Sequence, residues 1–301
     1  MDYNIKSIKE EFKKRGVFYT PPELAEMIKS YTPKNIIEVY DPTCGDGGLL
    51  KVFDDSVKKY GQEIDKVQCD VADEMLINKE IVCGDTLEEP AFRGKKFDCI
   101  VANPPFSIKW NPKVDERFED APTIPTKGRA DYAFILHILY YLSDDGIAVV
   151  LGSPGILYRG NREYKIRRWI IEQNYIEKIA LIPGDTFVDT AIPTVIIVFN
   201  KHKKDTSIEF EDKALKKKKI VTLEEVETND YGLSVSNYIQ EDIIKEDIDP
   251  IKMNEEARIQ MIKKLENDIK IDLLVCEFEK IDKVEYINIL INKLEQIKLE
   301  I

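Results

Sequence analysis

A short stretch, Asn103-Pro104-Pro105-Phe106, combines residue types that together can bind an amino group. It follows the apolar run Phe97–Ala102, which predicts a strand that the two prolines end, because proline cannot continue a hydrogen-bonded ladder. Consecutive prolines make a stiff turn, which can aim the Asn103 side-chain carbonyl and the Pro104 backbone carbonyl at one amine. Phe106 offers a flat face to an unstacked base. An ordinary strand-terminating turn is the alternative interpretation.

A glycine-rich turn, Asp41–Gly48, lies between a predicted strand over Ile36–Tyr40 and a predicted helical run over Leu49–Lys59. Glycines let the backbone turn sharply and approach a ligand closely. The start of the following helix offers free N–H groups. The spacing matches neither GxxxxGK[ST] nor GxGxxG, so the turn is unlike a phosphate cradle.

Two further acidic residues stand where the next strands would end. Glu63 lies in Gly61–Asp65, and a carboxylate at this place in a doubly wound fold holds a ribose diol. Asp85 lies in Gly84–Leu87 and can accept a hydrogen bond from an exocyclic adenine amine. With the glycine turn, these residues outline one nucleoside-shaped crevice.

The elements that would position these residues alternate between helix and strand. Helices are predicted over Pro22–Ser30, Tyr132–Leu142 and Tyr164–Asn174, and strands over Ile147–Leu151, Ile176–Ile182 and, as the last strand, Thr194–Phe199. This alternation predicts a doubly wound α/β fold, with a mixed, mainly parallel sheet covered on both faces.

The character of the chain changes after Asn200. Lys201–Lys219 is polar and is expected to be an exposed loop. Ile251–Ile301 is rich in Ile, Leu, Lys and Glu, with apolar residues at helical spacing. A helix–turn–helix and one long broken helix both fit this pattern. The apolar stripe packs either against its own domain or against a partner helix.

The net charge of −12 over 301 residues argues against nucleic acid as a ligand, because phosphate binding needs Lys and Arg. Most of the excess acid, however, lies after residue 204. A basic cluster with only one acid, Glu163, stands earlier in the chain. It consists of Arg159, Arg162, Lys165, Arg167 and Arg168. A solvated helix face is the alternative interpretation of this cluster.

Targeting and metal signals are weak. The first fifteen residues are charged throughout, and no apolar run is long enough to span a membrane, so we expect no membrane association. Five cysteines without a CxxC pair favour a reduced, cytoplasmic compartment. Two histidines make a His-rich metal site improbable, and we expect no metal.

Taken in order, the motifs resemble those of the N6-adenine DNA methyltransferases, specifically the modification subunits of type I restriction–modification systems. The resemblance covers about four fifths of the chain. It runs through Gly16–Pro21, Asp41–Gly48, Gly61–Ile64, Gly84–Leu87, Asn103–Phe106, Arg129–Phe134, Leu157–Gly160, Phe187, Ile192–Thr194, Asn229–Tyr231 and Val235–Tyr238.

The resemblance implies the Rossmann-like fold of class I methyltransferases and S-adenosylmethionine (SAM) as the methyl donor. It implies that Asn103, Pro104, Pro105 and Phe106 are catalytic, with Phe106 stacking on the target base. Further residues follow from it by function. Those implied to bind the cofactor are Tyr19, Thr20, Pro21, Asp41, Cys44, Gly45, Gly47, Glu63, Asp85 and Thr86. Those implied to face the target base or DNA are Phe106, Phe187, Asp131, Arg159, Arg162, Arg167 and Arg168.

The resemblance also suggests a division of the chain. We expect a short leader over residues 1–15, where larger members carry a helical domain, and a catalytic domain over residues 16–204. An extension or linker over residues 205–250 and a C-terminal helical segment over residues 251–301 complete the chain. DNA is the implied partner. The helical segment is the candidate surface for a specificity subunit or for self-association. Thr43 and Asp46 stand where the family more often has Ala and Ser.

Other functions fit part of the pattern. Methylation of RNA or of a protein glutamine can use the same Asn-Pro-Pro-aromatic turn. A non-catalytic assembly subunit could keep the fold, although the retained Asp41, Glu63, Asp85 and Asn103 argue against it. A nicotinamide-dependent oxidoreductase would leave Asn103–Phe106 without a role.

Overall fold

The computed structural model describes residues 20–184, 193–241 and 249–300. The chain divides into two compact units, with the boundary between Glu241 and Asp242. The first unit holds the sheet and all the predicted site residues that are described. The second unit is a pair of helices.

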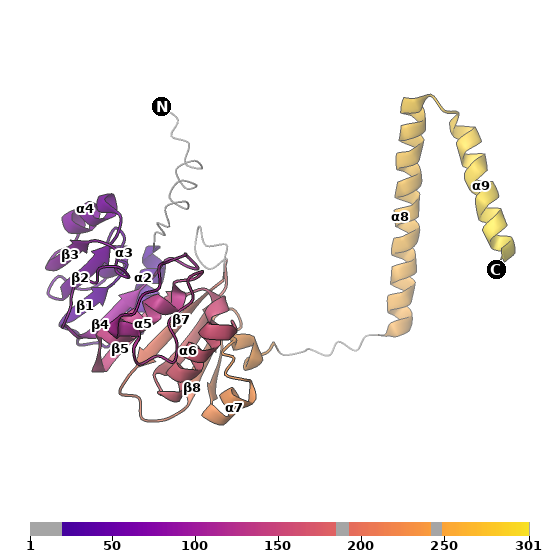
Figure 1. Cartoon of the computed structure of the whole chain (residues 1–301). Helices are drawn as coiled ribbons and strands as arrows, with labels where there is room; N and C mark the ends of the chain where they lie inside the picture. Colours follow the sequence, from indigo (N-terminus) through magenta and orange to yellow (C-terminus); the bar gives the residue numbers. More distant parts are fainter. Residues whose placement is uncertain (1–19, 185–192, 242–248, 301) are drawn as a thin grey trace, which may run out of the picture. The chain divides into compact units, whose positions relative to one another are not determined.

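Within the described residues, nine strands form one sheet in the order β3-β2-β1-β4-β5-β7-β6-β8-β9 (Figure 1). The strands are β1 (Glu38–Asp41), β2 (Lys58–Glu63), β3 (Lys79–Cys83), β4 (Phe97–Ala102), β5 (Leu142–Gly152), β6 (Ile176–Ile182), β7 (Thr194–Asn200), β8 (Ile208–Asp212) and β9 (Lys217–Val221). Strands β1 to β5 pair in parallel, whereas β7 runs antiparallel to both β5 and β6. The expected mixed, mainly parallel sheet is confirmed.

Helices cover both faces of the sheet. The helices of the first unit are α2 (Pro22–Lys29), α3 (Gly48–Lys51), α4 (Lys66–Met75), α5 (Asp131–Tyr141), α6 (Asn161–Glu172) and α7 (Leu223–Thr228). Side chains alternate along the central strands: Ile100 and Ala102 of β4 join the core under α5 and α6, while Cys99 and Val101 join the core under α2 and α3.

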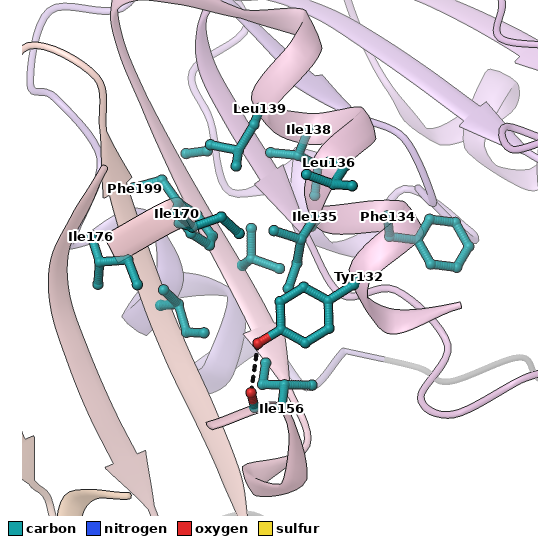
Figure 2. Packing of buried hydrophobic residues seen from close by; sticks show 14 of the residues in the cluster. Tyr132, Phe134, Ile135, Leu136, Ile138, Leu139, Ile156, Ile170, Ile176 and Phe199 are labelled. Carbon is teal, nitrogen blue, oxygen red and sulfur yellow. Dashed lines mark hydrogen bonds between the residues drawn. The ribbon is translucent and has the colours of Figure 1, made fainter. Parts of the chain in front are cut away.

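Helix α5 is buried on nearly every side, which its apolar sequence from Tyr132 to Leu139 requires. Tyr132 fixes its first turn, because the buried hydroxyl donates to Ile156 O at 2.7 Å (Figure 2). This hydrogen bond ties the start of α5 to the short η2 turn (Pro154–Leu157) that follows β5.

The strand order creates the place where a ligand would bind. The chain passes from β1 outward through β2 to β3 and then returns to β4 on the other side of β1. The connections after β1 and β4 therefore leave the sheet in opposite directions, which opens a crevice at the carboxyl ends of these strands. Asp41 ends β1, and Asn103 directly follows β4.

The predicted helix over Leu49–Lys59 is confirmed at its start but is too long. Helix α3 ends at Lys51, and Lys58 already begins β2. The polarity pattern does not predict this strand, because the charged Lys59 is buried in the sheet and only 1% exposed. Its ammonium donates to the carbonyls of Asp54 at 2.8 Å and Val57 at 3.1 Å, which satisfies the buried charge.

The sheet also extends beyond Thr194–Phe199, which was expected to be the last strand. β8 pairs with β6, and the lysine-rich segment expected as a loop forms the edge strand β9. Lys218 lies 3.3 Å from Glu209 across the strand pair, so the lysine run is matched by acids on its neighbour. Because the compact unit continues to Glu241, the expected domain end at residue 204 is too early.

The second unit is a helix–turn–helix, which decides between the two alternatives for this segment. Helices α8 (Pro250–Glu279) and α9 (Lys283–Glu300) are joined at Lys280, whose φ is 61°. Asp249 caps α8 by accepting from the amides of Ile251 and Lys252. The Tyr286 hydroxyl joins α9 to α8 through Asp272 at 2.7 Å. A membrane-spanning helix is not found among the described helices, since none is both long and apolar enough.

Candidate active site

The turn between β1 and α3 bends at two glycines with positive φ, 54° at Gly45 and 83° at Gly47. Gly47 N donates to Cys44 O at 2.8 Å and closes the turn. A Cβ on Gly47 would lie 2.9 Å from the Leu76 side chain, whereas no described atom lies within 4 Å of that position on Gly45. The backbone at Gly45 is therefore open to a ligand.

Glu63, at the end of β2, ties this turn to the next one. Its Oε2 accepts from Gly45 N at 3.0 Å, and its Oε1 accepts from Asp65 N at 2.8 Å. Gly61 allows the close approach of the two turns, because a Cβ there would lie 2.7 Å from the Cys44 sulfur. The Cys44 thiol is thus a buried packing group beneath the turn.

Asp41 lies under the glycine turn and is 1% exposed. Its Oδ1 accepts from Thr43 N at 2.9 Å. The pKa of Asp41 is raised to about 7, mainly because burial penalises the charged form, and Glu63 adds a smaller repulsion. The expected cofactor-loop aspartate is therefore half protonated near neutral pH.

The segment after β3 is held in place from two sides. Asp85 Oδ1 accepts from the amides of Leu87 at 2.8 Å and Glu88 at 3.3 Å, which fixes the bend. The Thr86 hydroxyl is buried and donates to Pro42 O at 2.6 Å. Thr86 thus joins the segment after β3 to the glycine turn, and the three predicted cofactor elements lie together.

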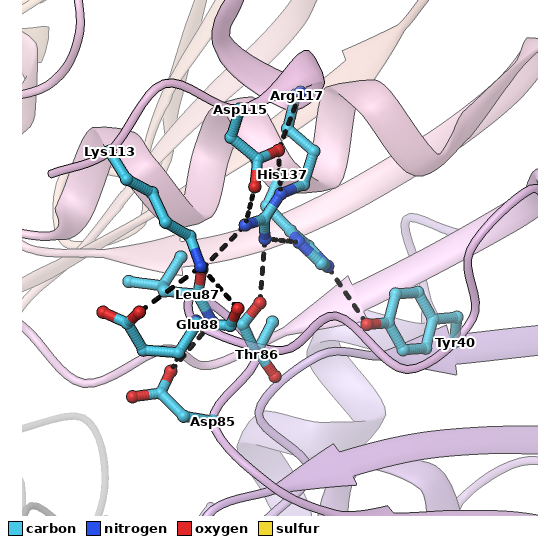
Figure 3. Close-up of polar contacts among 9 residues, drawn as sticks. All are labelled: Tyr40, Asp85, Thr86, Leu87, Glu88, Lys113, Asp115, Arg117 and His137. Carbon is cyan, nitrogen blue, oxygen red and sulfur yellow. Dashed lines mark hydrogen bonds and ion pairs between the residues drawn. The ribbon is translucent and has the colours of Figure 1, made fainter. Parts of the chain in front are cut away.

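A buried polar network holds the carbonyls of the segment after β3 (Figure 3). The sequence analysis did not predict this network. Arg117 donates to Thr86 O at 2.8 Å and to Leu87 O at 2.7 Å. Its Nε donates to Asp115 Oδ1 at 2.7 Å, and the nitrogen that contacts Leu87, Nη2, also donates to Asp115 Oδ2 at 2.8 Å. The sequence signal for it was slight, an Asp and an Arg two residues apart in a loop.

His137 completes this network inside α5. Arginine can only donate, so Arg117 Nη1, at 2.9 Å, requires His137 Nδ1 to accept. Nε2 then carries the proton and donates to the Tyr40 hydroxyl at 3.0 Å. Burial, with the Arg117 charge second, holds the pKa of His137 well below its ordinary value. The ring is neutral and structural.

The Asn103–Phe106 turn meets the glycine turn through Thr20. Asn103 Nδ2 donates to Thr20 Oγ1 at 3.0 Å. The Thr20 carbonyl lies 3.7 Å from the point where a Cβ on Gly48 would stand. Pro104 is buried and Phe106 is half-buried against the α2 and α3 side of the core. The structure therefore brings the two predicted halves of the site together.

Asp131 lies at the far side of the same turn. Its Oδ2 accepts from Ser107 N at 3.2 Å, directly after Phe106. It also lies 3.6 Å from Arg159 Nη1. Asp131, the first residue of α5, therefore contacts the residue that follows the turn.

The basic cluster does not act as one surface. Arg162 and Arg168 are exposed on α6, and Arg168 pairs with Glu172 at 2.7 Å. Arg167 is 3% exposed and donates to Tyr231 O at 2.9 Å and to Arg159 O at 2.8 Å. The expectation that Arg167 faces DNA is wrong, because its guanidinium is buried and donates to backbone carbonyls of this chain.

Some expected residues cannot be located here. Tyr19 and Phe187 lie outside the described residues. Pro21 is described and precedes α2, where its carbonyl accepts from Ala25 N at 3.0 Å. Pro21 is the N-cap residue of α2 and directly follows Thr20, which contacts Asn103.

The chain is similar to known proteins in sequence and in structure. Residues 2–220 match the family model described as N-6 DNA Methylase. The methylase subunit of the type I restriction enzyme MpnII from Mycoplasma pneumoniae is 33% identical over 64% of this chain and 42% of its own length. The MjaVII methylase subunit from Methanocaldococcus jannaschii is 30% identical over 81% of this chain and 53% of its own.

Among solved structures, a type I restriction–modification methyltransferase subunit from Streptococcus thermophilus has a TM-score of 0.68. It is 27% identical, and the match covers 74% of this chain and 60% of that one. The chain therefore shares the methyltransferase fold of that subunit.

With the family match covering most of the chain, the chain belongs to the N-6 DNA methylase family. It spans about half the length of the curated relatives it matches.

Proposed function

We propose that this chain transfers a methyl group from SAM to the N6 amine of adenine in DNA, as the modification subunit of a type I restriction–modification system. One observation carries the proposal. Thr20 contacts the Asn103 side chain and also lies against the start of α3. The Asn103–Phe106 turn and the glycine turn therefore lie beside the same crevice.

The described residues fit SAM at both ends of its nucleoside. Each oxygen of Glu63 accepts one backbone N–H and keeps a lone pair for a ribose hydroxyl. Both bonds to the Asp85 carboxylate use Oδ1, and among the described residues none is found at Oδ2, which can accept from the adenine amine. When bound, the cofactor would supply an electrophilic methyl on a sulfonium.

Asn103 is oriented for its part in the reaction. Because Nδ2 is used by Thr20, the amide carbonyl Oδ1 is the atom that remains to accept from the target amine. Pro104 supplies a second, backbone carbonyl in a turn that two prolines stiffen. Two acceptors favour a more pyramidal nitrogen and stabilise the positive charge that develops as N6 attacks. The chain thus contributes mainly position and electrostatics.

Phe106 is proposed to stack on the target adenine, which must leave the duplex to reach Asn103. Unstacking costs a few kcal/mol. The exposed Arg162 on α6 is a candidate to offset part of that cost through phosphate contacts, whereas Arg168 already pairs with Glu172.

The second unit is proposed to bind a specificity subunit or a second copy of the chain. Its helices expose many large apolar side chains, with Phe278 93% exposed and Met261 75% exposed. An apolar surface of this kind marks an interaction site in a soluble protein. Deleting residues 249–301 should abolish co-purification with the specificity subunit while cofactor binding survives.

The test of the proposed function uses SAM with a labelled methyl group and nucleoside analysis of the treated DNA. Wild-type protein, with a specificity subunit present, should yield N6-methyladenine. Asn103→Ala should abolish transfer and keep cofactor binding in calorimetry, whereas Asn103→Asp, which retains an acceptor oxygen, should keep part of the activity. Label appearing in RNA or in protein glutamine, and not in DNA, would refute the substrate.

A further inference from the structure

The residue after the Asn103–Phe106 turn has an unusual backbone conformation. Ser107 directly follows Phe106 and has a φ of 54°, in the left-handed region that side chains other than glycine seldom adopt. Its amide donates to Asp131 at 3.2 Å, and its hydroxyl accepts from Arg159 Nη2 at 3.0 Å. Two side chains from other elements therefore fix the exit of the turn.

The Arg159 side chain is largely buried and is held by several contacts. Its side chain is 18% exposed, and Nη2 also donates to Ser153 Oγ at 3.2 Å. A Cβ on Gly155 would lie 2.6 Å from Nε and Nη2, so the glycine leaves the room that the guanidinium fills. The buried Arg167 holds the Arg159 carbonyl at 2.8 Å and anchors its backbone.

The charges around Arg159 oppose contact with a phosphate. Its Nη1 lies 3.6 Å from Asp131 and 3.7 Å from Glu163, and both carboxyl side chains are buried. One guanidinium thus stands beside two acids, and its charge is already balanced. A DNA phosphate approaching Arg159 would meet these acids as well. The exposed Arg162, three residues further on, forms no ion pair with an acid among the described residues.

We propose that Arg159 is a positioning residue for methyl transfer: it holds Ser107, and through Ser107 the Asn103–Phe106 turn, and it does not bind DNA phosphate. This inference rests on the proposed function for its kinetic consequence, whereas its structural consequence can be measured without any activity. It replaces the expectation from sequence that Arg159 belongs to a DNA-binding face.

The first measurement is hydrogen exchange of the peptide containing Ser107, followed by mass spectrometry on the purified chain. Arg159→Gln and Arg159→Lys should speed hydrogen exchange at the Ser107 amide about tenfold. Neither side chain has the planar guanidinium that donates to both the Ser107 and the Ser153 hydroxyls. Gly155→Ala should do the same with Arg159 still present. The matched control Arg162→Gln should leave this exchange unchanged.

The amides of Phe97–Ala102 report whether each variant is folded, since β4 is central in the sheet. If Arg159→Gln fails that check, Gly155→Ala and Arg159→Lys decide the question. Unchanged exchange at Ser107 in the folded variants would overturn the proposal.

The second measurement separates positioning from phosphate binding. Arg159→Lys should lower kcat about tenfold with KM for DNA nearly unchanged. In Arg159→Gln, which removes the positive charge, the slope of log DNA affinity against log salt should equal that of wild type, whereas loss of one phosphate contact would reduce the slope by about 0.9. A reduced slope with normal kcat would overturn the proposal. A wild-type protein that transfers no methyl would refute the proposed function instead, and the exchange measurement would still decide the role of Arg159.

Discussion

Asp41→Asn tests the electrostatics beneath the glycine turn. The substitution keeps the side-chain shape and the oxygen that accepts from Thr43 N, and it removes a charge from a site that is 1% exposed. Burial raises the pKa of Asp41 from 3.8 to about 7. The folded state therefore binds a proton more tightly than the unfolded state does.

The sign of the effect follows from this difference. A carboxyl whose folded pKa is raised favours folding at low pH, and this stabilisation is lost as the pH rises from the unfolded to the folded pKa. One pKa unit corresponds to about 1.4 kcal/mol. Between pH 5.5 and pH 8, wild type should lose about 2 kcal/mol of folding free energy relative to Asp41→Asn.

The assay is urea denaturation of both proteins at several pH values across this interval. Unfolding of the first unit, which holds the sheet, is followed by near-ultraviolet circular dichroism. The difference in unfolding free energy should change with pH in favour of Asp41→Asn and level off above about pH 7.5. A difference that is constant from pH 5.5 to pH 8 would refute the reasoning, because Asp41 would then carry the same charge in both states.

Three further predictions concern residues around the same crevice. Gly61→Ala places a methyl group 2.7 Å from the Cys44 sulfur and should cost about 1–3 kcal/mol in urea denaturation, with part recovered in Gly61→Ala/Cys44→Gly. Full stability of the single variant would contradict this packing. Arg117→Met should cost about 3–5 kcal/mol and weaken cofactor binding in calorimetry, because it removes the donor from the buried Thr86 and Leu87 carbonyls and leaves the half-buried Asp115 without its charge partner. A loss below about 1 kcal/mol would show that the network is dispensable. Phe106→Ala should raise KM for DNA and lower kcat while the cofactor Kd is kept; an equal loss of cofactor affinity would exclude a role confined to the target base.

The site could be predicted from sequence where its residues follow strands. Glu63, Asp85 and Asn103 stand at the carboxyl ends of β2, at the turn after β3, and after β4, and parallel strands bring these ends to one edge of the sheet. Local sequence order was therefore enough to group them. The register that makes Thr20 the bridge to Asn103 involves residues 83 positions apart, and no local pattern encodes it.

Polarity misled the prediction where a charged side chain is buried. Lys59 was predicted to end a helix, yet it lies in a strand and its ammonium donates to backbone carbonyls. Arg167 looked like part of a basic surface, yet its guanidinium links α6 to Tyr231 and Arg159. Long basic side chains can be buried when their donors find carbonyls, and only tertiary structure shows which ones do.

The edge of the sheet shows a related difficulty. The polar composition of Lys201–Lys219, which includes the lysine run Lys216–Lys219, predicts an exposed loop. At an edge strand, lysines are compatible with pairing and protect the free edge from other chains. The acids of β8 opposite them, Glu209 and Glu211, supply the charge balance that the one-dimensional pattern could not assign.

The most direct test of the account is a crystal structure of the chain with S-adenosylhomocysteine, the product that methyl transfer would leave. We predict ribose hydroxyls on Glu63, the adenine amine on Asp85, and the sulfur facing the carbonyl of Asn103. A product bound elsewhere, or bound here with the sulfur directed away from Asn103, would contradict the central claim that the stiff proline turn and the glycine turn serve one reaction.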